Sequence, residues 1–142
     1  MADTHHIIAL ADSLSACADA LHARLMHAIR QPAPGGQAPA ISQGAAQALF
    51  ENEVTLRQRA NSLYLDAARL AASGLDSAQQ QLLDVTARAR DAIARIDRAK
   101  DLIDIAAELL SLGAAVATGK PERLVAPLEK LKHHVDALLP TR

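Results

Sequence analysis

Aromatic residues are almost missing from this chain of 142 residues, which has one Phe, one Tyr and no Trp. Proteins that hold single-stranded nucleic acid stack bases on aromatic side chains, and this sequence offers no such platform. The formal net charge is −1, with acidic and basic residues mixed along the chain. A nucleic-acid binder needs a basic face that displaces counterions, so the composition argues against nucleic acid as a partner.

Cysteine is also scarce, because Cys17 is the only thiol. The sequence therefore has no disulfide framework and no thiolate metal cluster. Cys17 lies on an apolar helical stripe, where a thiol behaves as a small hydrophobe. With no strands there is no strand-to-helix elbow for a nucleophilic serine. We predict no catalytic residue and no cofactor, and we expect that the protein is not an enzyme.

The N-terminal stretch MADTHHIIALADS lacks the basic region and the continuous apolar run of a secretory signal, so we expect a cytoplasmic protein. Arg outnumbers Lys by 11 to 4, and the chain contains 32 Ala and 21 Leu residues. The Arg and Ala bias is typical of bacteria with GC-rich genomes. Ala and Leu favour helices, whereas the residues that favour strands are few, and this balance predicts an all-α protein. The length suits a single helical domain over residues 1–142.

Apolar residues recur every three or four positions in four segments, which predicts helices over residues 4–30, 41–73, 77–118 and 121–139. The stretch QPAPGGQAPA, residues 31–40, cannot continue a helix and is expected to be a flexible linker. The link at residues 74–76 is short, with Gly74 as a C-terminal cap and Asp76 as an N-cap. We therefore predict an antiparallel up-down four-helix bundle whose helices 41–73 and 77–118 form a long, coiled-coil-like hairpin.

The helix lengths are unequal, because residues 77–118 would form a helix of roughly 60 Å and residues 121–139 one of about 30 Å. The tip of the hairpin, residues 60–90, would then be bare of covering helices. Uncovered apolar surface usually marks a partner, so we predict a protein partner or self-association as a homodimer at this tip. The candidate contact residues there are Leu63, Leu65, Leu70, Leu82 and Leu83.

Four carboxylates recur at steps of four, three and four residues and would share one face of the helix 77–118. Such a row could bind a cation or a basic partner. The preferred interpretation is a solvated face, or one that pairs with Arg57, Arg69, Lys130 or Lys132 on other helices. The row consists of Asp97, Asp101, Asp104 and Glu108.

Histidines lie near the start of the first predicted helix and the end of the last, which an up-down bundle would place at one end. His5 or His6 could then approach His133 or His134 and bind zinc, copper or nickel. Exposed, unconnected histidines are the preferred interpretation, so we predict no metal site. Glu53 falls on an apolar stripe, where we expect it to pair with Arg57 at the i+4 position.

The leading hypothesis for function is a non-enzymatic protein–protein interaction module, of the adaptor, chaperone or immunity type. An alternative is a membrane-surface or pore-forming helical protein that uses the apolar hairpin 102–139, although each arm is shorter than the ~20 residues that span a bilayer. A second alternative is a metal-binding bundle that uses the acidic row or the histidines.

Overall fold

The computed structural model describes residues 4–30, 41–72 and 75–139, with the side chains of Asp76 and Ser77 excepted. This part of the chain is all-α and contains no strand. The elements are α1 (Thr4–Arg30), α2 (Gln43–Leu65), α3 (Ala67–Ala71), the 3₁₀ turn η1 (Leu75–Ala78), α4 (Gln79–Ile93), α5 (Ala99–Ala117), η2 (Pro121–Arg123) and α6 (Val125–Leu138).

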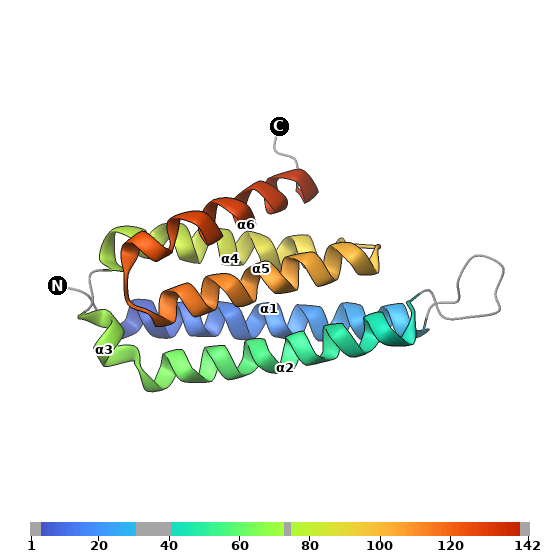
Figure 1. Cartoon of the computed structure of the whole chain (residues 1–142), viewed down its shortest axis with the longest axis horizontal. Coiled ribbons are helices and arrows are strands. Elements are labelled where there is room, and N and C mark those ends of the chain that lie inside the picture. The colour runs from blue at the N-terminus through green and yellow to red at the C-terminus, as the bar shows by residue number, and fades with distance from the viewer. Residues whose placement is uncertain (1–3, 31–40, 73–74, 140–142) are drawn as a thin grey trace.

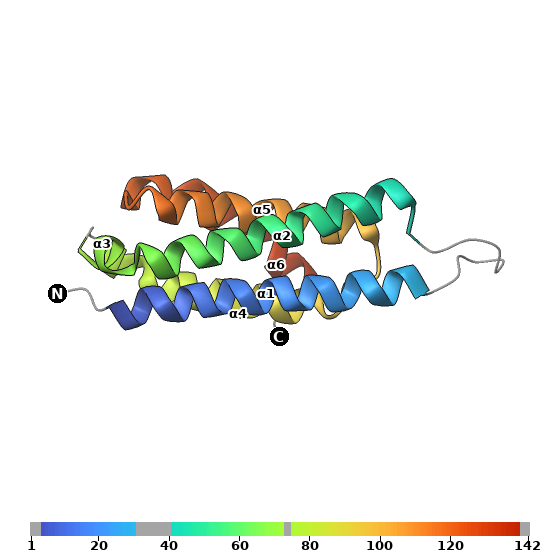
Figure 2. The same ribbon diagram turned by 90° about the horizontal axis from the view of Figure 1, so that it is seen from below.

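The long helices pack side by side along one common direction (Figures 1 and 2). α1 packs on α2 and α4, and α5 packs on α2 and α6. α6 also packs on α4, and it diverges from the other helices toward its end (Figure 1). α1 packs against both α2 and α4, which are separated along the chain by α3 and η1.

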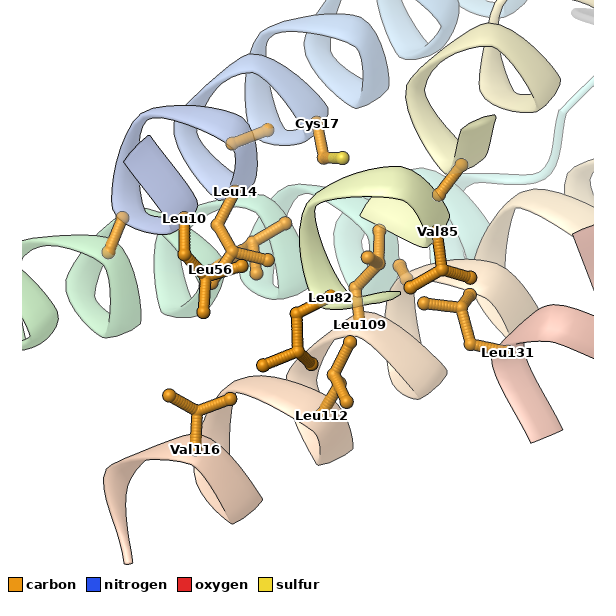
Figure 3. Packing of buried hydrophobic residues seen from close by; sticks show 14 of the residues in the cluster. Leu10, Leu14, Cys17, Leu56, Leu82, Val85, Leu109, Leu112, Val116 and Leu131 are labelled. Carbon is orange, nitrogen blue, oxygen red and sulfur yellow. The ribbon is translucent and has the colours of Figure 1, made fainter. Parts of the chain in front are cut away.

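The prediction for the first helix is confirmed, since α1 spans Thr4–Arg30. Its inward stripe repeats every three or four residues and includes Leu10, Leu14 and Cys17, each at most 2% exposed. Figure 3 shows Leu10 and Leu14 near Leu56 of α2, with Cys17 further along α1. Burial of this stripe stabilises α1, because a helix in water gains little from its intrinsic propensity alone.

The prediction of one continuous helix over residues 77–118 is wrong, because the chain reverses at residues 94–98 between α4 and α5. The last turn of α4 tightens, and the amides of Arg95 and Ile96 bond to carbonyls three residues earlier. The Arg24 guanidinium of α1 donates to the Ile96 carbonyl and also meets Asp97 at 3.3 Å. A distant side chain therefore satisfies the end of α4, where no Pro or Gly marks the break.

The predicted hairpin with a bare tip is also wrong, because the reversal lays α5 beside α2 and leaves α4 against α1 and α6. Three of the residues expected at the bare tip belong to the core: Leu63, Leu70 and Leu82 are at most 1% exposed. Leu83 is partly buried against the same core, and Leu65 alone of the five is exposed, at 87%.

The predicted helix 41–73 is divided into α2 and α3 by a turn at Asp66. Its expected end at Gly74 and the linker 31–40 both lie outside the described residues. The predicted helix end at residue 118 is confirmed to within one residue, because α5 stops at Ala117 and Gly119 adopts a left-handed φ of 71°. Pro127 lies in the first turn of α6, where a missing amide breaks no helical hydrogen bond.

Thr86 of α4 connects α1 to α4 inside the core. Its side chain is fully buried, accepts a hydrogen bond from Ser13 Oγ at 2.7 Å and donates to the Leu82 carbonyl at 2.8 Å. The Cys17 thiol donates to the Thr86 carbonyl at 3.3 Å. In the described residues, no helix has both the length and the apolarity needed to cross a lipid bilayer.

Candidate functional site

The predicted acidic row does not share one helical face, because Asp97 belongs to the reversal between α4 and α5. Asp97 is almost fully exposed and meets Arg24 at 3.3 Å. Asp101 lies in the first turn of α5, where the helix dipole favours a carboxylate. Asp104 and Glu108 follow on α5 and line a groove. Three of the four residues of the row, Asp101, Asp104 and Glu108, therefore remain on one helix, α5.

That groove runs between α5 and α6 and has a volume of about 540 Å³. Asp104, Glu108 and Lys130 supply its charges. Glu108 is already engaged, since its two oxygens lie 2.9 and 3.0 Å from His134 Nδ1 of α6. This pair joins α6 to α5, and its side chains are only 12% and 18% exposed. The remaining lining residues are Ala107, Ser111, Ala126 and Pro127.

The expected meeting of the terminal histidines rested on an odd number of chain reversals, three between four helices, and the extra reversal at 94–98 removes that basis. α1 begins at one end of the molecule, whereas α6 ends near its middle (Figures 1 and 2). His5, His6 and His133 are exposed, and His134 holds Glu108. Among the described residues, no three His, Cys, Asp or Glu side chains form a group that could hold a metal ion.

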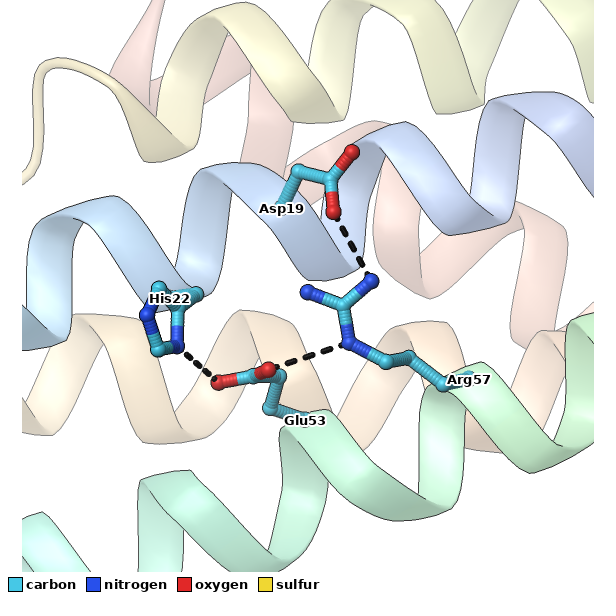
Figure 4. A network of polar contacts seen from close by, with 4 residues as sticks. All are labelled: Asp19, His22, Glu53 and Arg57. Carbon is cyan, nitrogen blue, oxygen red and sulfur yellow. Dashed lines mark hydrogen bonds and ion pairs between the residues drawn. The ribbon is translucent and has the colours of Figure 1, made fainter.

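Glu53 is the buried carboxylate between α1 and α2 (Figure 4). Arg57 Nε donates to its Oε2 at 3.0 Å, as the i+4 spacing predicts, and His22 Nδ1 of α1 lies 2.9 Å from its Oε1. Arg57 also donates to Asp19 at 2.8 Å. The hydrogen bond to Asp19, ahead of that to Glu53, raises the pKa of the Arg57 guanidinium above its usual value.

Nucleophilic chemistry finds little support in the described side chains. Burial raises the pKa of the Cys17 thiol to about 12, so the reactive thiolate is absent at neutral pH. Tyr64 donates a hydrogen bond to Asp12 of α1, and this bond raises the pKa of the phenol. Both groups join helices to one another.

The outward face of α2 carries a continuous uncharged stripe, here called the α2 stripe. Its residues follow one another at steps of four, three, four, four, three and four, so they share one narrow face of the helix. All of them are exposed, and Phe50, Val54 and Leu65 are 51%, 38% and 87% exposed. The α2 stripe consists of Gln43, Gln47, Phe50, Val54, Gln58, Asn61 and Leu65.

Sequence reasoning missed this stripe because it followed only the inward stripe of the same helix. The spacing of Phe50, Val54 and Leu65, and the lack of charge at the other positions on the same helical face, were visible in the sequence. The pairs His22–Glu53 and His134–Glu108 had no comparable signal, since each depends on which helices become neighbours.

Comparisons with protein families, with curated proteins and with solved structures found no match to this chain.

Proposed function

We propose that the chain is a non-enzymatic helical module for protein–protein interaction, of the adaptor, chaperone or immunity type, in the cytoplasm of a bacterium. The observation that carries the proposal is the α2 stripe. It extends over about 33 Å of helix at 1.5 Å per residue and has no charged position. Phe50 and Val54 are neighbouring exposed apolar residues of the stripe, and Leu65 lies about three turns further on, beyond Gln58 and Asn61. Exposed apolar residues rimmed by polar ones are typical of protein-binding surfaces.

The polar residues elsewhere in the described structure support a non-catalytic role. Glu53, Glu108 and Thr86 each connect two helices. Such groups position helices, which is what an interaction module needs from its buried polar residues.

The experiment is affinity capture from a lysate of the source organism, with the tagged wild-type chain compared with Phe50→Glu. Phe50 is 51% exposed, so the variant is expected to fold, and its circular dichroism spectrum checks this. The matched control is Ala87→Glu, which adds the same charge at an exposed site on α4.

We expect that Phe50→Glu loses a protein which the wild type and Ala87→Glu both retain. The retained protein is either a different protein or an untagged copy of the chain. If all three baits retain the same proteins, the α2 stripe is not a binding surface and the proposal fails.

A further inference from the structure

We infer that the α2 stripe binds the α2 stripe of a second copy of this chain, with the two helices parallel. This inference rests on the proposed function, because it names the partner of the same surface. Three features of the stripe support it: its lack of charge, the match between identical positions, and the opposite charges on its two edges.

A surface without charge offers no electrostatic selection for a charged partner. Every long helix of the described structure, α2 included, exposes charged side chains, such as Asp12 on α1, Glu51 on α2 and Arg90 on α4. The charges of α2 lie outside the α2 stripe, and the same stripe on a second copy matches it in length and polarity. A patch that binds itself gives a closed twofold dimer.

The parallel orientation pairs each position of the stripe with itself. Phe50, Val54 and Leu65 of one copy each meet the identical residue of the other copy. Asn61 meets the Asn61 amide of the other copy, which both donates and accepts. A single buried Asn pair of this kind sets register in parallel coiled coils. An antiparallel pair centred on Val54 would instead place Phe50 against Gln58 and Leu65 against Gln43.

The edges of the stripe carry opposite charges. Glu51 and Arg57 lie three residues before and after Val54, about 60° to either side of the stripe at 3.6 residues per turn. Glu51 is exposed, and the Arg57 side chain, which also pairs with Asp19 and Glu53, remains 40% exposed. A parallel twofold pair brings the Glu51 edge of one copy to the Arg57 edge of the other, whereas an antiparallel pair brings like edges together. Charges that flank an apolar seam set its orientation in this way.

The test begins with sedimentation velocity of the purified full chain over a roughly hundredfold concentration range around micromolar, because a single helix pair buries an area at the low end of specific interfaces. We expect a monomer–dimer equilibrium. Phe50→Glu should raise the dissociation constant at least about tenfold, because truncating a central aromatic contact commonly costs that much. Ala87→Glu should leave the dissociation constant unchanged.

Orientation is tested with Gln47→Cys and Asn61→Cys, each oxidised alone and as a mixture. The native thiol of Cys17 is buried and protonated, so it does not compete. A parallel pair gives disulfide-linked dimers of each variant alone. An antiparallel pair gives them only in the mixture, and this result would overturn the orientation. Ala87→Cys is the control that should not cross-link.

The two proposals can fail separately. The chain could stay monomeric while its stripe still retains another protein from the lysate. That result overturns the second copy as the partner, but the proposed function as an interaction module stands. A dimer that Phe50→Glu does not weaken overturns the stripe as the dimer contact. A monomer whose captured proteins do not depend on Phe50 overturns both.

Discussion

Glu53 allows a quantitative test of how α1 and α2 are held together. Its side chain is 7% exposed, whereas its partners His22 and Arg57 are 47% and 40% exposed. A hydrogen bond to a charged group is worth about 1.5–3 kcal/mol when buried, and partial exposure lowers each of these two bonds to roughly 1 kcal/mol. Glu53→Ala removes both bonds, so we expect it to lower the free energy of unfolding by about 2 kcal/mol.

Glu53→Leu should cost less than Glu53→Ala, within about 1 kcal/mol of the wild type, because an apolar side chain can replace a buried ion pair. Leu49 and Leu56 already flank this position on the same buried stripe. Arg57→Ala should cost about 1.5 kcal/mol in the wild type, since it leaves the buried carboxylate with one partner. In the Glu53→Leu background it should cost about 0.5 kcal/mol or less, because only the exposed pair with Asp19 remains.

The measurement is urea unfolding, followed by the helical circular dichroism signal, of four chains: the wild type, Glu53→Leu, Arg57→Ala and the double variant. The expected coupling energy is about 1 kcal/mol, which corresponds to a difference in melting temperature of about 4 °C for a domain of this size. If Arg57→Ala costs the same in both backgrounds, Arg57 does not stabilise the Glu53 carboxylate and the reasoning is refuted.

Three further predictions concern the core and the helix ends. The pKa of Cys17 is raised from 9.0 to about 12, so burial stabilises the folded state fully below pH 9, and this contribution is lost as the pH rises from 9 to 12. Between pH 8 and pH 10 the wild type should therefore lose about 1.4 kcal/mol more than Cys17→Ala in urea unfolding, and an equal loss would contradict the burial effect. Gly113→Ala should stabilise the chain by about 0.5–1 kcal/mol, because the new Cβ would make an ordinary contact 3.6 Å from Arg59. Gly119→Ala should destabilise it by about 1 kcal/mol, because φ there is 71°, and thermal melts showing the same sign for both glycines would be inconsistent with these environments. Thr86→Val should cost about 1–2 kcal/mol in urea unfolding, whereas a cost near zero would mean that its buried hydroxyl does not stabilise α4.

The sequence determines α1 almost completely, because Ile7, Leu10 and Leu14 begin a stripe that never changes phase. The reversal at residues 94–98 could not be predicted in the same way. A continuous helix would carry the buried stripe from Ile96 on to Ala99 and Ile103, but these are only partly buried, and the buried positions resume at Leu102 and Ile105. Apolar residues occupy both sets of positions, so periodicity alone does not distinguish a continuous helix from two helices.

Among the polar residues, too, contacts within one helix could be predicted from the sequence, whereas contacts between helices could not. The pair of Glu53 and Arg57 lies within one helix, and its i+4 spacing predicts it. The pair of Glu108 and His134 and the contact of Arg24 with Ile96 depend on how the helices pack. The physical origin of these contacts is long-range, and no local pattern encodes them.

The position of α2 between α1 and α5 has a consequence for the synthesis of the chain on the ribosome. α1 and α2 emerge first and can pair at once, but the side of α2 that meets α5 stays uncovered until residue 117 has been made. α4, which emerges between them, packs on α1 and does not cover that side. A nascent chain that ends near the reversal at 94–98 therefore exposes apolar surface that the finished protein buries, and this intermediate is where a general chaperone would bind.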